Sequence, residues 1–520
     1  MRIVFILLLL SNSTVFGQHI GTLYLSNCDT IPDNLYNRKY LTTLRIENSM
    51  GYCRSPVKIL SAKIANLENL ESLSYESSYK FAPLPPEIKF LKKLTYLATS
   101  DVIPEIGEIK SLKTLSLTVY TDAELRDLKE LSFKNLVNLE YLYIRFNGRL
   151  NPTESIAILK DIGALTSLKH FEVFNGNNEI LAQIAGLKNL ESIAINGLKG
   201  QLELDFSAFP NLNALAITRA EGMDKFPKSI YTLSQLTDLS ITNTDLVEIP
   251  DGISALKQLQ NLNLTFNKIT YLAKDFVELN KLETISLVRN FNLKFLPAEI
   301  GKLTNLKRLA VQSCHLSKLP ESVMDLTNLE ALVFNFNDIV ALPEDWSKLK
   351  NLKVLNAERN KLETIPASLL TLENLEVLQL GHNCLLGDIF MNQQLPIGGL
   401  RSLKQLDFQY NDLLVLPYDI GMLKNLEDLN IYKNNLLSLP ESIGQLGKLS
   451  SLSMSENQLS SLPKSMKKLR IYEFSLHNNA FVNYKSMVKN FPRAKRVWID
   501  EKFRDDVHIF PRLGREVYFR

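Results

Sequence analysis

The chain has 520 residues, of which 45% are hydrophobic and 22% charged, and its formal net charge is +3 at neutral pH. These proportions are those of a folded protein with a large core. The small basic excess argues against nucleic acid or an anionic membrane as the partner, because either needs a clustered basic surface.

Residues 1–17 have the pattern of a secretory signal peptide. Arg2 precedes the eight-residue apolar run Ile3–Leu10, and the polar stretch that follows ends in Val15-Phe16-Gly17, with small residues where a signal peptidase reads the chain. The apolar run is too short to span a bilayer as a helix. The alternative is a retained, buried strand. We predict an exported protein without a transmembrane segment, which is secreted, periplasmic or at the cell surface.

A repeat runs through most of the chain after this segment. Leu259–Asn267 reads LQNLNLTFN, Leu352–Asn360 reads LKVLNAERN, and Leu426–Asn434 reads LEDLNIYKN. All three fit L-x-x-L-x-L-x-x-N, the strand segment of leucine-rich repeats. Twenty such units start at Ile20, Leu41, Leu70, Leu94, Leu112, Leu139, Leu168, Leu190, Leu212, Leu236, Leu259, Leu282, Leu306, Leu329, Leu352, Leu375, Leu403, Leu426, Leu449 and Leu469.

The alternation inside each segment predicts a half-buried strand. Leu262 and Leu264 alternate with polar Asn261 and Asn263. One such strand does not bury its apolar face alone, so consecutive units stack into a continuous core. We therefore predict an α/β solenoid: a leucine-rich-repeat horseshoe with a parallel concave sheet. Its expected parts are an N-terminal cap with the first repeats (18–69), the solenoid (70–480) and a C-terminal cap (481–520).

The asparagine that ends the segment has an expected backbone role. Its carboxamide carries both a donor and an acceptor, so it satisfies peptide groups that the turn leaves unpaired. Cys28 and Cys314 take the same place in their units. The predicted ladder comprises Asn147, Asn267, Asn290, Asn337, Asn360, Asn383, Asn411, Asn434 and Asn457.

A proline follows the strand in many units, as at Leu319-Pro320 and Leu439-Pro440. Because proline fixes φ and lacks an amide hydrogen, it ends the ladder and opens a helical turn. We expect short helices or 3-10 turns on the convex side. The units from Leu236 to Leu469 resemble the Leu-Pro type of leucine-rich repeat found in Ras-scaffold proteins and plant disease-resistance receptors. An exported bacterial leucine-rich-repeat protein is similar in overall plan. The resemblance implies a horseshoe that binds proteins, chiefly through its concave face.

The four cysteines and the chain ends depart from the repeat. Cys28 and Cys53 lie in neighbouring units, where a disulfide and two unbonded thiols are both consistent with the sequence. Cys314 and Cys384 are three units apart, too far to bond to each other. After Ala480 we expect the chain to leave the repeat and to cover the last unit.

Two clusters on the expected concave face are candidate partner-binding sites, because aromatic and arginine side chains dominate many interfaces. The alternative is that these residues only pack against their neighbours. The first cluster comprises Phe336, Arg359, His382, Tyr410, Tyr432 and Lys433. The second comprises Tyr141, Tyr143, Arg145, Phe146, His170 and Phe174. Insertions at Asn147–Leu168 and Leu385–Leu403 are further candidates.

No catalytic chemistry is expected. The motifs G-x-x-x-x-G-K-[ST], G-x-S-x-G and H-E-x-x-H do not occur, and the six histidines are scattered singly. We predict no enzyme activity, no cofactor, no metal and no nucleic acid partner; the predicted partner is a protein, and the oligomeric state is not predicted. The alternative function is an intracellular signalling scaffold of the Ras-associated kind that keeps residues 1–17.

Overall fold

The structure is a computed structural model. It describes residues 21–25, 33–48, 60–77, 84–119, 127–146, 159, 161–391, 395–482, 489–509 and 516–520. The predicted signal peptide, Cys28, Cys53 and Asn147 lie outside these residues. The chain divides into two compact units, Met1–Ile195 (unit 1) and Asn196–Arg520 (unit 2), which are described separately.

Unit 1 is built from parallel strands joined by single helical turns. In register, Leu44 pairs with Leu73 and Leu73 with Leu97, so the apolar residues of successive strands stack in one row. The strands are β1 (Thr22–Leu25), β2 (Thr43–Asn48), β3 (Ser72–Ser77), β4 (Tyr96–Thr99), β5 (Thr114–Val119), β6 (Tyr141–Phe146), β7 (His170–Phe174) and β8 (Ser192–Asn196). Its helical turns include η1 (Asp33–Asn37), η2 (Ala62–Asn66), η3 (Pro86–Phe90), η4 (Pro104–Glu108), η5 (Ile162–Ala164) and the α-helix α2 (Asn178–Gln183).

Unit 2 has the same plan, and its strands from β12 to β21 are shorter. The strands of unit 2 are β9 (Ala214–Thr218), β10 (Asp238–Thr242), β12 (Asn261–Asn263), β14 (Thr284–Ser286), β15 (Arg308–Ala310), β16 (Ala331–Val333), β17 (Val354–Asn356), β18 (Val377–Gln379), β19 (Gln405–Asp407), β20 (Asp428–Asn430), β21 (Ser451–Ser453), β22 (Arg470–Ser475), β23 (Arg493–Ile499) and β24 (Glu516–Phe519). Two short strands, β11 (Glu248–Ile249) and β13 (Tyr271–Leu272), pair separately.

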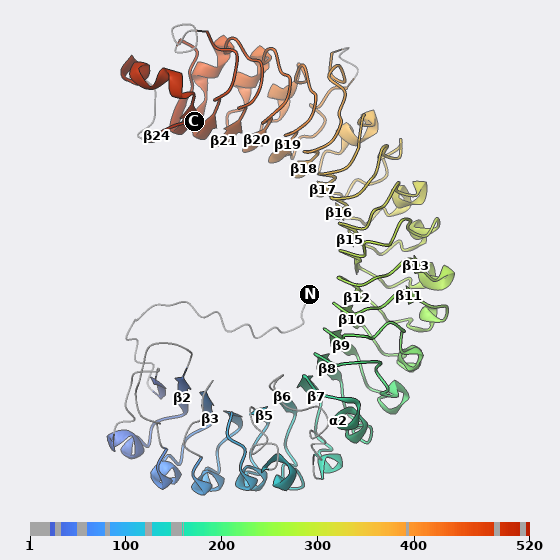
Figure 1. The fold of residues 1–520 in the computed structure, drawn as a ribbon, viewed down its shortest axis with the longest axis vertical. Helices are drawn as coiled ribbons and strands as arrows, with labels where there is room; N and C mark the ends of the chain where they lie inside the picture. Colours follow the sequence, from blue (N-terminus) through green and yellow to red (C-terminus); the bar gives the residue numbers. More distant parts are fainter. Residues whose placement is uncertain are drawn as a thin grey trace. The chain divides into compact units, whose positions relative to one another are not determined.

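The turns of unit 2 are 3-10 helices on the side away from the sheet, so the strands line the inner side of the curve (Figure 1). Pro320 and Pro440 are the N-cap residues of η11 and η14, as the Leu-Pro steps predict. The predicted solenoid is confirmed. The turns are η6 (Phe206–Ala208), η7 (Lys228–Thr232), η8 (Ile253–Ala255), η9 (Lys274–Glu278), η10 (Ile300–Lys302), η11 (Glu321–Asp325), η12 (Ala367–Thr371), η13 (Ile420–Met422), η14 (Glu441–Gln445), η15 (Lys464–Lys468) and η16 (Glu501–Ile509).

A buried row of asparagines, which we call the ladder asparagines, links neighbouring repeats by hydrogen bonds. The Asn360 amide nitrogen donates to the Ala357 carbonyl of its own unit (3.0 Å) and to the Phe334 carbonyl of the preceding unit (3.1 Å). Its side-chain oxygen accepts the Ile339 amide (3.1 Å). The same arrangement, with donation to both units and acceptance of a backbone N–H, recurs at Asn267, Asn290, Asn337, Asn383, Asn411, Asn434 and Asn457.

The C-terminal end of the repeat differs from the expectation in two ways. Ser451 pairs with Glu473, so the twentieth unit aligns on Ile471 rather than on the expected Leu469. Asn479 is its ladder asparagine, since it donates to Met454 and Leu476 and accepts from the Leu459 amide. The chain does not leave the sheet after Ala480: β23 and β24 extend it in parallel. Apolar residues of β23 such as Val497 are buried like those of a repeat, so the sheet continues through this strand.

Candidate partner-binding surface

In each of five successive repeats of unit 2, one residue with a large side chain has an unusual backbone conformation. The residue just before the ladder asparagine has a left-handed φ of 56° at Phe336, 53° at Arg359, 53° at His382, 51° at Tyr410 and 53° at Lys433. This conformation costs a non-glycine residue about 1 kcal/mol or more. The same left-handed φ recurs at Phe266, Arg289, Ser313 and Glu456, so it belongs to the repeat, and the large side chains are what distinguish these five positions.

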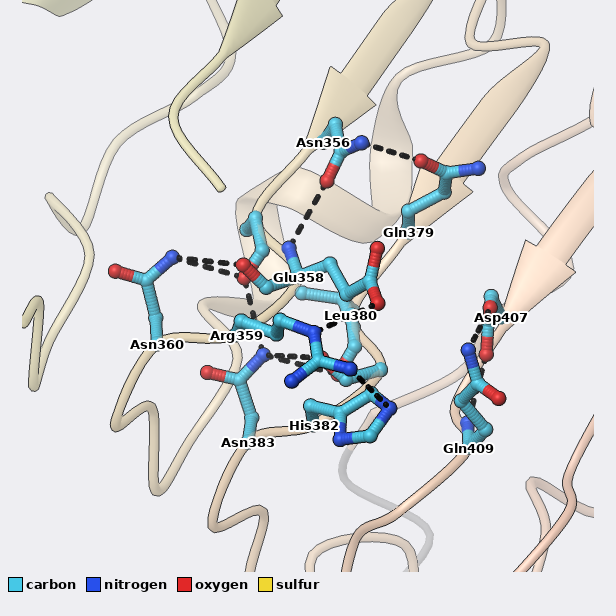
Figure 2. Close-up of polar contacts among 12 residues, drawn as sticks. Asn356, Glu358, Arg359, Asn360, Gln379, Leu380, His382, Asn383, Asp407 and Gln409 are labelled. Atoms are coloured by element: carbon cyan, nitrogen blue, oxygen red, sulfur yellow. Dashed lines mark hydrogen bonds and ion pairs between the residues drawn. The ribbon is translucent and has the colours of Figure 1, made fainter. Parts of the chain in front are cut away.

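These side chains contact one another across the units and form the aromatic–cation column: Phe336, Arg359, His382, Tyr410, Tyr432 and Lys433. The Arg359 guanidinium lies 5.0 Å from the Phe336 ring centroid. It also lies 3.4 Å from Nε2 of His382 (Figure 2). The rings of His382 and Tyr410 stack with centroids 4.0 Å apart and an angle of 14°. Tyr432 meets Tyr410 edge-on at 5.3 Å, and the Lys433 ammonium lies 4.8 Å from the Tyr410 ring.

The column is held by its own contacts and still open to solvent. Phe336 is 49% exposed, and Arg359 and Lys433 are also exposed. Burial, and after it the charge of Arg359, lowers the pKa of His382, so the ring is neutral at neutral pH and stacks as an aromatic group. Mutual packing and partner binding are therefore both compatible with this geometry. A prepacked, exposed row loses little side-chain entropy when a partner covers it.

A second cation–aromatic pair occupies the position before the ladder asparagine in two earlier repeats of unit 2. The Arg289 guanidinium lies 4.7 Å from the Phe266 ring, and both residues precede a ladder asparagine with a left-handed φ. Neither residue was a predicted site residue. The signal was present, because each residue stands immediately before Asn290 or Asn267.

The outward-facing side chains of the strands beside the column form a sheet face that carries amide groups on β17 and β18 and a carboxyl group on β19. Polar Asn356 and Gln379 hydrogen bond to each other across β17 and β18 (Figure 2). On β19, burial raises the pKa of the Asp407 carboxyl to about 6. Its oxygens accept from the Gln409 backbone N–H at 2.8 Å and from the Asn430 amide at 3.3 Å. Asp407 was not a predicted site residue, since spacing alone does not distinguish it from other solvent-facing strand residues.

The second predicted cluster comes together in unit 1 with one exception. Tyr141 stacks on His170 at 4.3 Å and 9°, and the Arg145 guanidinium lies 4.3 Å from the Phe174 ring. Tyr143 is half-buried on the same face of β6. Phe146 is only 3% exposed, so the prediction that it faces a partner is wrong. It ends the strand on the apolar side, where the alternation places it in the core.

The insertion after Leu385 divides between core and surface. Phe390 is buried and packs edge-to-face on Phe408 at 5.7 Å, whereas Met391 is 52% exposed. Phe390 therefore belongs to the core. The other insertion, Asn147–Leu168, lies largely outside the described residues.

The described residues contain no cluster of three or more His, Cys, Asp or Glu side chains able to hold a metal ion. In the same part of the chain, no helix has the length and apolarity that crossing a membrane requires. Cys314 is buried at a ladder position, where its thiol lies 3.1 Å from the Leu287 carbonyl, and burial raises its pKa to about 11. Cys314 and Cys384 are both free thiols.

Comparison with known families identifies the repeat. The family model of a leucine-rich repeat region matches residues 16–221 and 189–309, and a leucine rich repeat model matches residues 327–385. The chain belongs to the leucine-rich repeat family. No curated protein sequence matches it.

Solved leucine-rich-repeat structures share the fold. The plant peptide hormone receptor RGFR1, in complex with RGF2, is 22% identical over 96% of this chain and 94% of that chain, with a TM-score of 0.54. The HAESA ectodomain of Arabidopsis, in complex with an IDA peptide hormone ligand, is 20% identical over 95% and 77%, with a TM-score of 0.53. An internalin from Listeria monocytogenes is 22% identical over 61% and 92%, with a TM-score of 0.50. At these identities the likeness shows the fold alone.

Proposed function

We propose that this leucine-rich-repeat protein is an exported binding module that recognises a protein or peptide through the sheet face of unit 2. The observation that carries the proposal is the aromatic–cation column. Five neighbouring repeats place large aromatic or cationic side chains in contact with one another beside the sheet face. Such side chains supply most of the affinity in many interfaces.

The fold neighbours support a binding role. The peptide hormone receptor RGFR1 was solved in complex with RGF2, and HAESA with an IDA peptide hormone ligand. The function we propose is recognition without catalysis, since the repeat units account for most of the chain. Export rests on the pattern of residues 1–17, and it is tested by the mature N-terminus: Gln18 supports export, and an intact Met1 supports the intracellular scaffold.

A cross-linked pull-down from native extract tests the binding site. The column variant combines Phe336→Ser, Arg359→Ser, Tyr410→Ser and Tyr432→Ser. A matched control carries the same four kinds of substitution at exposed positions outside the column: Phe295→Ser, Arg401→Ser, Tyr271→Ser and Tyr418→Ser.

We expect wild type and the control to capture the same specific protein, and the column variant to lose it while keeping the circular dichroism spectrum of the fold. Equal capture by the column variant would overturn the assignment of the site. The unit 1 cluster around Tyr141 and Arg145 would then be the next surface to test.

A further inference from the structure

Small aliphatic side chains interrupt the polar sheet face of unit 2. The solvent-facing positions of β12, β14 and β21 are Asn, Thr or Ser. On β16, β17 and β18 the same face carries Val333, Val354 and Val377 together with Ala331, which is buried; we call these four residues the valine pad. Its three valines are half-buried although solvent-facing. Register places Ala331 beside Val354, and Val354 beside Val377, so the pad is continuous across three strands.

Two carboxylates stand beside the pad without a cation. Asp407 and Asp428, the acidic pair, lie on the neighbouring strands β19 and β20, and each is partly buried on the sheet face. The described residues provide no ion pair to either one. Their hydrogen-bond partners, such as Gln409, Asn430 and Ser451, are all neutral.

Several other carboxylates of unit 2 are neutralised within the chain. Glu330 pairs with Lys353 at 2.9 Å and Glu376 with Lys404 at 2.7 Å, each to the lysine one unit further along. The nearby Glu358 pairs with Arg359 at 3.6 Å. The acidic pair is therefore an uncompensated negative charge on the sheet face. A cation from a partner would complement it.

Geometry relates the pad to the acidic pair. Asp407 lies one strand over and two residues along from Val377, a separation of about 8 Å from standard strand spacings. An extended peptide advances about 3.3 Å per residue, and a lysine or arginine side chain adds several ångströms of reach. One peptide thus spans both surfaces over a few residues. Gly381 has no side chain beside this carboxyl: a Cβ there would lie 3.1 Å from Oδ1 of Asp407.

From these features we infer that the sheet face of β16–β20 binds an extended peptide segment carrying an aliphatic side chain two to four residues from a lysine or arginine. The aliphatic group covers the valine pad, the cation meets the acidic pair, and the aromatic–cation column borders the peptide. This inference rests on the proposed function and specifies the chemistry of its ligand.

The test uses a display library of random twelve-residue peptides, selected in parallel on the full-length protein and on its variants. Asp407→Asn removes one charge of the acidic pair, and Asp412→Asn removes an exposed carboxylate off the sheet face as its control. Val354→Thr makes the pad polar with the same branching, and Val340→Thr does so at an exposed position elsewhere. Fluorescence anisotropy then measures the dissociation constant of an enriched peptide for each variant.

We expect enriched peptides to share an aliphatic residue near a basic one. Asp407→Asn and Val354→Thr should each weaken binding tenfold or more, and the two controls less than twofold. Alanine in place of the peptide's basic residue should weaken binding to wild type but add little further loss with Asp407→Asn. Near-additive losses would show that the two groups do not meet.

The outcomes separate this inference from the proposed function. Enriched peptides without a basic residue, or peptides indifferent to Asp407→Asn, would overturn the ligand chemistry while the column variant still tested the site. The ligand chemistry would also be overturned, with the proposed function intact, if no peptide is enriched above bare support although the pull-down captures a partner. If enriched peptides bind both the sheet variants and the column variant as well as wild type, both proposals are wrong.

Discussion

Replacement of Asn360 by alanine tests the physical basis of the repeat. The Ile339 amide would lose its only hydrogen-bond partner in the described structure, the Asn360 side-chain oxygen, and remain buried. The carbonyls of Phe334 and Ala357 would each lose one of two donors, because Asn337 still donates to the first and Asn383 to the second. An orphaned buried amide costs about 1–3 kcal/mol, and a lost hydrogen bond about 0.5–1.5 kcal/mol. We therefore expect a destabilisation of about 2–6 kcal/mol.

The matched control is Asn351→Ala. Asn351 is exposed and makes one hydrogen bond, to the Thr327 carbonyl at 2.9 Å, so its loss should cost about 1 kcal/mol or less. Urea unfolding compares the two variants with wild type. Because long repeat arrays unfold non-cooperatively, amide exchange of the segment containing Ile339 provides the local readout. Equal stability of the two variants, or unchanged exchange at Ile339, would refute the role assigned to the ladder.

Three further predictions concern titrating groups and the column. Because burial raises the pKa of Asp407 to about 6, the carboxyl is protonated more readily in the folded chain than in the unfolded one, and its ionised form destabilises the fold above that pH. Asp407→Asn should therefore raise the free energy of unfolding at pH 7.5, with the gain vanishing as pH falls from about 6 to 4; a pH-independent effect would contradict this. The charged groups facing it are Glu358 and Asp428, whose charges act in the same direction, so neither reverses the sign. At pH 8 the exposed Cys384 should react with a thiol reagent while buried Cys314 reacts only after unfolding, and similar rates for Cys384→Ser and Cys314→Ser would show that burial does not protect Cys314. In the unfolded, unreduced protein, two titratable thiols would establish the Cys28–Cys53 bond and four would exclude it. Replacing Arg359 by glycine removes the left-handed strain along with the contact to Phe336, so stability should change by less than about 1 kcal/mol while partner binding falls; a loss of several kcal/mol would mark Arg359 as structural.

The repeat could be predicted from the sequence because its leucines and its Leu-Pro steps recur at regular spacing. A strand starts two residues after the expected leucine from Leu41 to Leu449, and the Leu-Pro steps mark the turns where η11 and η14 begin. The register error near Leu469 arose because two apolar residues, Leu469 and Ile471, compete for one place. The full pattern through Phe474, Leu476 and Asn479 decides between them.

The candidate site was readable only in part. The column followed from position, since five of its members stand just before the ladder asparagines and Tyr432 precedes Lys433. The contacts between Arg359, Phe336 and His382 depend on rotamers, which a repeat pattern does not specify. The valine pad and Asp407 were not predicted, because alternation shows only that a residue faces outward. It does not show whether outward-facing valines on neighbouring strands form a continuous surface, or whether a carboxylate has a counter-ion.

The central claim is that a partner covers the sheet face of unit 2, and site-specific photo-cross-linking tests it most directly. A photoreactive phenylalanine analogue replaces Tyr410 in the column or, in a second protein, Tyr418 beside η13, which is 52% exposed. After irradiation in native extract, we predict a cross-linked species of defined mass from position 410 and none from position 418. The reverse pattern would place the partner on the outer side of the solenoid and contradict the account.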